Sequence, residues 1–228
     1  MAYYNWFNEY FKEKHKNSTT EEILDDVFLM LEKRGSEYLK HNYESYKQLW
    51  IDPKEDIVNS KPQVIQQIRE ELYDFLKLLI EKNVKKVLQI GLGHFGSTQF
   101  CLSLICDEIV TVEYDIKNIA TYANRELLYN QNKEHFIYGD SADENVISQA
   151  VNYGKFDAVF IDGNHSYEYV KKDYKNYSSL VKIGGIVAFH DACLDAERYG
   201  TPKVLSELHR EVVLIKHSNE VGIAYYIK

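Results

Sequence analysis

The sequence has few cysteines and no long apolar run, and each shortage excludes a class of protein. Its three cysteines include no C-x-x-C pair, so we expect neither a disulfide framework nor a zinc knuckle. Charged residues interrupt the apolar stretches, and the start "MAYYNWFNEYFKEKHK" has neither a clean apolar core nor a cleavage site. We therefore expect a soluble, cytoplasmic protein with no membrane partner.

Basic residues are also in the minority. The 228 residues include 27 Lys and Arg against 35 Asp and Glu, which gives a net charge of −8. Such a chain repels a phosphate backbone, so we expect no nucleic-acid partner. The hydrophobic fraction of 45% is enough for one substantial core with a small appended segment.

The first sixty residues have helical patterns and no strand pattern. In "STTEEILDDVFLMLEKRG", Thr19 and Glu22 have the spacing of a capping box, and apolar residues repeat along one stripe. Two of the three prolines fall in "IDPKEDIVNSKP", which indicates a boundary near residue 60. We predict a helical extension over residues 1–60. It is either a lid over an acceptor pocket or a surface that packs on the core or on a second copy in a homo-oligomer.

From residue 61 onward a helix is followed by short apolar strands that alternate with helices. The predicted strands are "KVLQIG", "EIVTVEY", "HFIYGD", "FDAVFID", "GGIVAFH", "VVLIKH" and "GIAYYIK". The first five are nearly continuous apolar runs, which is typical of parallel strands covered on both faces. Only the short turn "SNEV" joins the last two, so they should form an antiparallel hairpin. The fold class is therefore α/β: a doubly wound, Rossmann-like, mostly parallel seven-stranded sheet with a C-terminal hairpin.

Polar residues gather at the carboxyl ends of these strands, where ligands bind in doubly wound sheets. The first strand ends in "VLQIGLGHFGSTQF", whose glycines Gly91, Gly93 and Gly96 let backbone N–H groups approach a ligand. The second ends at Glu113, close to the spacing of about 20 residues after the turn that is typical of a ribose-binding carboxylate. These two features fit either a nicotinamide dinucleotide or S-adenosylmethionine.

The third strand ends in acids, in "YGDSADE", and the fourth and fifth end in acids and histidines, in "FIDGNHSY" and "AFHDA". Taken in order, "VLQIGLGHFGST", Glu113, "YGDS", "FDAVFIDGNHSYEYVKKDY" and "GGIVAFHD" resemble the class I S-adenosylmethionine-dependent methyltransferases. Within that class they are similar to small-molecule O-methyltransferases of the macrolide-sugar and catechol type. The resemblance covers residues 61–228 and implies one methyltransferase domain there, with S-adenosylmethionine as its cofactor.

The resemblance also implies roles for single residues. The three glycines would surround the methionine moiety, and Glu113 would accept both ribose hydroxyls. Asp140 would take the adenine amino group, with Ser141 and Ala142 beside it. Two alternatives stay open: Asp140 as a helix N-cap, and Glu113 as a solvated residue at a strand end.

In metal-dependent relatives an acid follows the fourth strand and an acidic or amide pair follows the fifth. Asp162, His190 and Asp191 match these positions, so the resemblance implies a metal site there. His190 stands where an oxygen ligand is usual, which favours Mn²⁺ or another transition ion over Mg²⁺. The cation would lower the pKa of an acceptor hydroxyl, whereas the alternative is a general base, His165 or His190, oriented by Asp162.

The predicted reaction is methyl transfer from S-adenosylmethionine to a hydroxyl of a small molecule or sugar. Amino-group methylation of DNA is not expected, because "DGNHSY" stands where such enzymes carry a proline pair. Two other classes of function stay open, since a fold does not fix a function. They are a noncatalytic protein that binds the cofactor or a nucleotide sugar, and a nicotinamide-dependent oxidoreductase.

Overall fold

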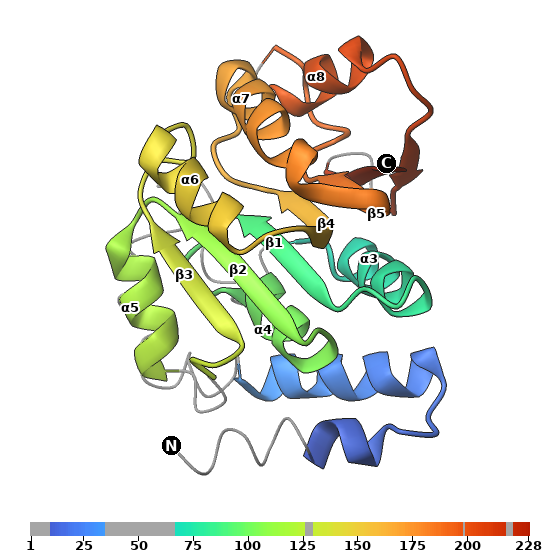
Figure 1. The fold of residues 1–228 in the computed structure, drawn as a ribbon. Helices are drawn as coiled ribbons and strands as arrows, with labels where there is room; N and C mark the ends of the chain where they lie inside the picture. Colours follow the sequence, from blue (N-terminus) through green and yellow to red (C-terminus); the bar gives the residue numbers. More distant parts are fainter. Residues whose placement is uncertain (1–9, 35–66, 126–129, 198, 218–220) are drawn as a thin grey trace, which may run out of the picture.

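The structure, a computed structural model, describes residues 10–34, 67–125, 130–197, 199–217 and 221–228 (Figure 1). The predicted boundary near residue 60 and most of the predicted turn "SNEV" lie outside these ranges. The division of the chain at residue 60 therefore stays a prediction.

A seven-stranded sheet in the order β3-β2-β1-β4-β5-β7-β6 forms the centre of the molecule (Figure 1). The strands are β1 (Lys86–Ile90), β2 (Glu108–Glu113), β3 (Glu134–Tyr138), β4 (Phe156–Ile161), β5 (Val181–Phe189), β6 (Val213–Ile215) and β7 (Ile223–Ile227). β1 to β5 are parallel, and β7 runs antiparallel to both β5 and β6. The predicted fold class is confirmed, including the C-terminal hairpin.

Helices cover both faces of the sheet. They are α3 (Arg69–Glu81), α4 (Ser97–Ile105), α5 (Ile116–Arg125), α6 (Glu144–Asn152), α7 (Tyr167–Tyr177) and α8 (Thr201–Glu207). Side chains of α3, α4 and α5 belong to one buried apolar cluster, and those of α6, α7 and α8 belong to a second. Along β1, Val87 joins the first cluster whereas Leu88 and Ile90 join the second, because alternate side chains of a strand point to opposite faces. Because the strands are buried on both faces, they are nearly continuous apolar runs in the sequence.

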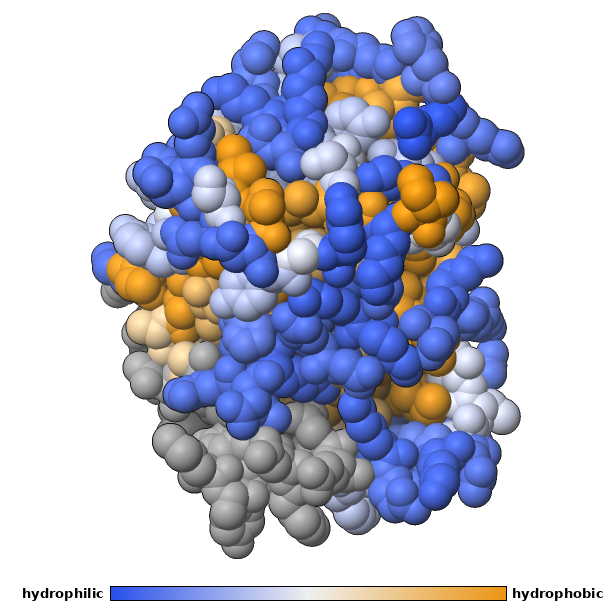
Figure 2. Space-filling view, in the orientation of Figure 1, coloured by the Kyte–Doolittle hydropathy of each residue, from blue (hydrophilic) through white to orange (hydrophobic). Residues whose placement is uncertain are grey.

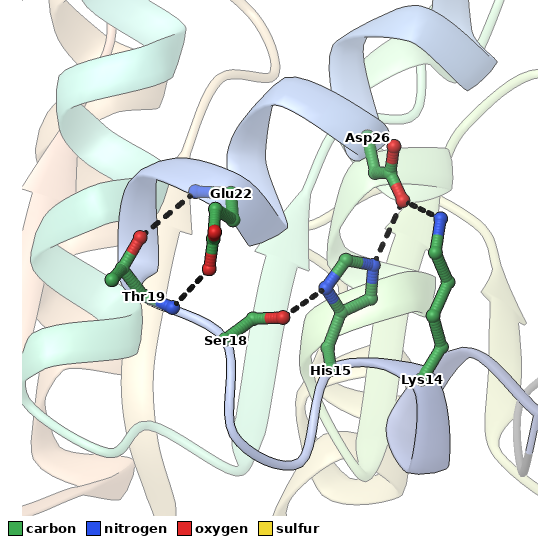
Figure 3. Close-up of polar contacts among 6 residues, drawn as sticks. All are labelled: Lys14, His15, Ser18, Thr19, Glu22 and Asp26. Carbon is green, nitrogen blue, oxygen red and sulfur yellow. Dashed lines mark hydrogen bonds and ion pairs between the residues drawn. The ribbon is translucent and has the colours of Figure 1, made fainter.

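The described part of the N-terminal region, drawn in blue in Figure 1, is helical over residues 10–14 and 20–34. The predicted capping box is confirmed: the Thr19 hydroxyl accepts from the Glu22 N–H at 3.2 Å, and the Glu22 carboxylate accepts from the Thr19 N–H at 2.8 Å (Figure 3). Asp26 joins the two helices by contacts with Lys14 and His15 (Figure 3). Five apolar side chains of this region lie in the same buried cluster as α3, namely Phe11, Leu24, Val27, Phe28 and Leu31. This region therefore packs on the face of the sheet that α3 and α4 cover.

The surface is mixed in character. The face shown in Figure 2 is largely hydrophilic, and its apolar residues stand in separate spots. Among the described helices, none is both long enough and apolar enough to cross a membrane.

Candidate functional site

A cavity of about 910 Å³ lies where the carboxyl ends of β1 to β5 meet. This volume is within the range of about 300–1,000 Å³ that is typical of small-molecule sites. Most of the predicted site residues line it: Gly91, Gly93, Glu113, Asp140, Ser141, Asp162, His165, His190 and Asp191. Gly96 and Ala142 are not among its lining residues. The sheet thus brings nine of the predicted residues to one cavity, whereas their individual roles stay predictions.

The glycine turn packs closely on the end of β4. Gly91 has a φ of 92°, and a Cβ at this position would lie 2.1 Å from the carbonyl oxygen of Asp162. Gly96 has a φ of 54° and is the residue before α4, where a Cβ would lie 2.5 Å from the ring of Tyr122. Gly91 therefore lets the turn approach the backbone of Asp162 within the site, whereas Gly96 lets Tyr122 of α5 pack against the turn.

Glu113 ends β2 and is buried, with 7% of its surface exposed, so the alternative of a solvated strand end is wrong. One carboxylate oxygen accepts from the backbone N–H groups of Leu92 at 2.7 Å and Gly93 at 3.3 Å. The other accepts from the N–H of Asp115 at 2.7 Å and from the side-chain amide of Asn118 at 3.3 Å. Glu113 consequently holds the glycine turn in place through one short and one long hydrogen bond, from Leu92 and Gly93.

Asp140 lies in the loop after β3 and does not cap a helix. Its carboxylate accepts from the N–H of Ala142 at 2.8 Å and from the hydroxyl of Tyr169 at 2.9 Å. The N-cap of α6 is Asp143, whose carboxylate accepts from the N–H groups of Asn145 and Val146. The alternative of an N-cap role for Asp140 is therefore wrong, because the helix begins one turn later than the sequence suggests.

Two acids and two histidines converge where β4 and β5 end. His190 Nδ1 lies 3.0 Å from Asp162 and 3.1 Å from Asp191, and His165 Nδ1 lies 2.5 Å from the second oxygen of Asp191. The contacts of His190 have ion-pair distances, but neither of its ring nitrogens has a hydrogen-bond partner. Asp162, His165 and Asp191 each offer a ligand atom within 4.8 Å of the others, which is a spacing that suits one metal ion. The predicted metal set named His190 instead of His165.

The electrostatics of this cluster favour the ionised form of Asp191 and raise the pKa of both histidines. Burial by itself lowers the pKa of His190, but the charges and contacts of Asp162 and Asp191 outweigh it and raise that pKa. Burial likewise opposes the charge of Asp191, yet the two histidines hold its pKa well below the usual range. The hydrogen bond to Asp191 raises the pKa of His165. The two carboxylates thus require positive charge between them.

Sequence reasoning missed two cavity residues that contact the predicted acids. Gln67, just before α3, donates its side-chain amide to Asp162 at 3.0 Å, and Tyr169 on α7 donates its hydroxyl to Asp140. Tyr169 stands within the "HSYEYVKKDY" stretch, one turn into the helix that follows the β4 loop, which is a signal that could have found it. Gln67 is separated from Asp162 by 95 positions, and nothing in its local sequence indicates the contact.

Residues 88–192 match the family model described as a methyltransferase domain. This match confirms the predicted resemblance to methyltransferases over these residues. No protein among the curated sequences matches the chain.

Solved structures of methyltransferases have the same fold. An O-methyltransferase from Bacillus cereus, in complex with S-adenosylhomocysteine, is 17% identical with a TM-score of 0.56, covering 86% of this chain and 91% of its own. A candidate caffeoyl-CoA O-methyltransferase from Staphylococcus aureus is also 17% identical, with a TM-score of 0.55 and coverage of 96% and 99%. The N-methyltransferase NodS from Bradyrhizobium japonicum is 15% identical, with a TM-score of 0.54 and coverage of 82% and 97%. At these identities the likeness shows the fold, which O- and N-methyltransferases share.

Proposed function

We propose that the chain transfers the methyl group of S-adenosylmethionine to a hydroxyl of a small molecule or sugar, since residues 88–192 match the model of a methyltransferase domain. The observation that carries this proposal is the position of the acid and histidine cluster. Gly91 of the glycine turn packs on the backbone of Asp162, so the turn and the cluster share one wall of the cavity. A methyl donor seated on the turn would lie next to groups that can bind and deprotonate a hydroxyl.

The residues at the β2 and β3 ends of the cavity fit S-adenosylmethionine. Each oxygen of Glu113 makes one short hydrogen bond of 2.7 Å and one long one of 3.3 Å. Ribose hydroxyls could replace the long contacts while the short bond from Leu92 continues to hold the turn, so the ribose role of Glu113 is compatible with its structural role. Tyr114 is 75% exposed on the cavity wall and offers an aromatic face for the adenine ring, and Asp140 lines the same cavity.

The acid cluster fits a divalent cation. Asp162 and Asp191 supply oxygen ligands, and a histidine supplies nitrogen, with His165 the nearer fit by ligand spacing and His190 the one implied by the family pattern. A set of mixed oxygen and nitrogen ligands favours Mn²⁺ or another transition ion over Mg²⁺. When bound, such a cation would act as a Lewis acid that lowers the pKa of the acceptor hydroxyl.

The side chains of the cluster divide the remaining tasks. In the alternative without a cation, the neutral form of His165, whose side chain is half exposed, can take a proton from an acceptor hydroxyl at the ring nitrogen that Asp191 does not contact. The side chain of His190 is only 8% exposed, and it places positive charge between the two carboxylates. His165 is therefore the better placed of the two candidate bases.

The charges of the cavity also bear on the class of methyl acceptor. Four carboxylates face the cavity, from Glu113, Asp140, Asp162 and Asp191. The two histidines, a divalent cation and the cationic methyl donor would offset these charges, so we propose an acceptor without net charge.

Calorimetry with S-adenosylmethionine and S-adenosylhomocysteine tests the cofactor. We expect both to bind and Glu113→Ala to weaken binding by roughly 2–4 kcal/mol, because hydrogen bonds to charged groups contribute about 1.5–3 kcal/mol each and the turn loses its anchor. Glu108→Ala, a change of the same residue type at the other end of β2, is the control and should leave the affinity unchanged. Tight NADH binding without any response to S-adenosylmethionine would overturn the proposal.

Product analysis tests the reaction. The protein is incubated with S-adenosylmethionine and a panel of catechols, sugars, amines and coenzyme A thioesters, before and after EDTA treatment with dialysis. We expect methylation of a neutral hydroxyl compound, lost on chelation and restored by Mn²⁺. Full activity after verified metal removal, with loss only in His165→Ala or His190→Ala, would replace the metal by a histidine base.

A further inference from the structure

Gln67 reaches into the cavity from the segment just before α3 and contacts two parts of the site. Its side-chain nitrogen donates to one carboxylate oxygen of Asp162 at 3.0 Å. Its side-chain oxygen accepts from the hydroxyl of Ser97 at 3.2 Å. Because one end of the amide is a donor and the other an acceptor, these two partners fix the orientation of the whole group.

The contact with Gln67 makes the two oxygens of Asp162 inequivalent. The oxygen held by Gln67 is Oδ2, whereas Oδ1 lies 3.0 Å from His190 Nδ1 and faces the acid and histidine cluster. A carboxylate without such a partner would rotate about its terminal torsion, which is a broad and soft one. Gln67 is neutral, so it orients Asp162 without neutralising the charge that would attract a cation.

Ser97 gives the same side chain a second connection. It is the first residue of α4, directly after Gly96, and therefore belongs to the turn that would hold the methyl donor. Gly91 of that turn already packs on the carbonyl of Asp162. The backbone contact and the Gln67 bridge thus join the turn to the same acid on two sides.

α3, the helix that follows Gln67, is firmly held. Its residue Glu71 is fully buried and accepts from the backbone N–H groups of His217 at 3.0 Å and Gly222 at 2.9 Å. Leu72 and Phe75 on the same helix lie in the buried core. Gln67 therefore extends from a fixed element, which is what an orienting residue requires.

We propose that Gln67 is a positioning residue that holds Asp162 in the orientation that binds the divalent cation and connects it to the glycine turn. The proposal rests on the metal part of the proposed function. Partners that orient a metal ligand typically contribute about 10–100-fold to metal affinity. Gln67 would act through Asp162 without touching the cation.

The test is calorimetric titration of Mn²⁺ into the full chain with bound S-adenosylhomocysteine. Gln67→Met keeps the length of the side chain and removes both hydrogen bonds. We expect Mn²⁺ affinity to fall by about 10–100-fold, while S-adenosylhomocysteine affinity measured without metal changes by less than about 3-fold. Ser97→Ala removes only the second partner, so its loss of Mn²⁺ affinity should be smaller. Gln149→Met, the same change at an exposed position on α6, is the control and should have no effect.

Each result decides the matter. Unchanged Mn²⁺ affinity in Gln67→Met overturns the inference about Gln67 and leaves the proposed function standing. Equal losses of Mn²⁺ and S-adenosylhomocysteine affinity, accompanied by a lower melting temperature, would show that Gln67 only supports the fold and would also overturn it. If the unaltered chain binds S-adenosylhomocysteine but no Mn²⁺, the metal part of the proposed function fails and the inference fails with it, whereas cofactor binding stands.

Discussion

Two groups of buried carboxylates lie in different parts of the molecule and have opposite surroundings. Away from the cavity, Glu134 is satisfied by neutral donors: the amide of Gln99 at 2.8 Å, the hydroxyl of Tyr122 at 2.9 Å and the N–H of Asn130 at 3.1 Å. Glu71 likewise accepts from two backbone N–H groups. The carboxylates of such acids accept hydrogen bonds from donors within the chain and stabilise the packing of its elements.

Two acids at the cavity, Asp162 and Asp191, have a charged neighbour instead. Asp162 and Asp191 face each other across His190, whose ring nitrogens have no hydrogen-bond partner although both are buried. A structural network would be expected to satisfy these groups, since an unpartnered buried polar atom costs about 1–3 kcal/mol. The difference between the two groups indicates which carboxylates belong to the fold and which are held ready for a ligand.

Asp173 on α7 fits neither group. Its side chain is fully buried, its two oxygens have no hydrogen-bond partner, and it lies near Gly163 behind the wall of the cavity. Burial, reinforced by the nearby charge of Asp140, raises its pKa to about 7. A neutral carboxylic acid is therefore an important form of this residue near physiological pH.

The largest effect should come from breaking the cavity group at Asp191. Asp191→Asn should lower turnover on a hydroxyl acceptor by about 10²–10⁴-fold, because the residue loses the charge that orients His165 and that would bind a cation. Asp191 has a φ of 58°, a conformation that Asn also adopts readily, so the fold should be retained. Initial rates measured beside a thermal melt check this. Turnover above half that of the unaltered chain would contradict it.

Removing Glu134, an acid of the structural group, should lower stability and leave cofactor affinity unchanged. Glu134→Ala should lower the free energy of unfolding by about 2–4 kcal/mol, since three donors lose their acceptor in the interior. Urea unfolding measures the loss, with Glu108→Ala on the neighbouring strand as the control. The affinity for S-adenosylhomocysteine, measured well below the melting temperature, should stay the same. A loss of affinity without a loss of stability would show that the two groups are not separate.

Asp173 should make the stability of the protein depend on pH. Its folded pKa of about 7 exceeds the unfolded value of about 3.9, so the folded state binds the extra proton between these values. Its contribution to stability is full below about pH 4 and is lost as pH rises through about 7. Asp173→Asn should therefore stabilise the protein by about 1–3 kcal/mol at pH 8 and have little effect at pH 4. Urea unfolding at both pH values tests this, and an equal effect at both would contradict the raised pKa.

The smallest effect should come from the exposed capping box of the N-terminal region. Thr19→Ala removes the hydroxyl that accepts from the Glu22 N–H, and should cost about 1 kcal/mol of unfolding free energy. The same urea experiment measures it, so this value gives a scale for the losses at buried acids. A loss as large as that of Glu134→Ala would mean that the N-terminal helices contribute more to the core than an exposed cap indicates.

Much of the fold could be predicted because the signals are local. The runs that became β1 to β5 are apolar on both faces, and "SNEV" is too short for a parallel crossover, so sheet direction follows from the sequence. The start of α6 was misjudged because Asp140, Ser141 and Asp143 all stand near it and each is a good capping type. Only the folded loop shows that Asp140 turns toward Ala142 and Tyr169 instead.

The sequence by itself determined that acids and histidines would meet in this protein, because the carboxyl ends of neighbouring parallel strands share one edge of the sheet. Tertiary structure alone decided how they meet. It brought Gln67 to Asp162 across 95 positions, paired His165 with Asp191, and placed His190 between both carboxylates. The reason is physical: periodicity specifies which face of an element is buried, whereas contacts between side chains distant in the chain depend on how those faces pack.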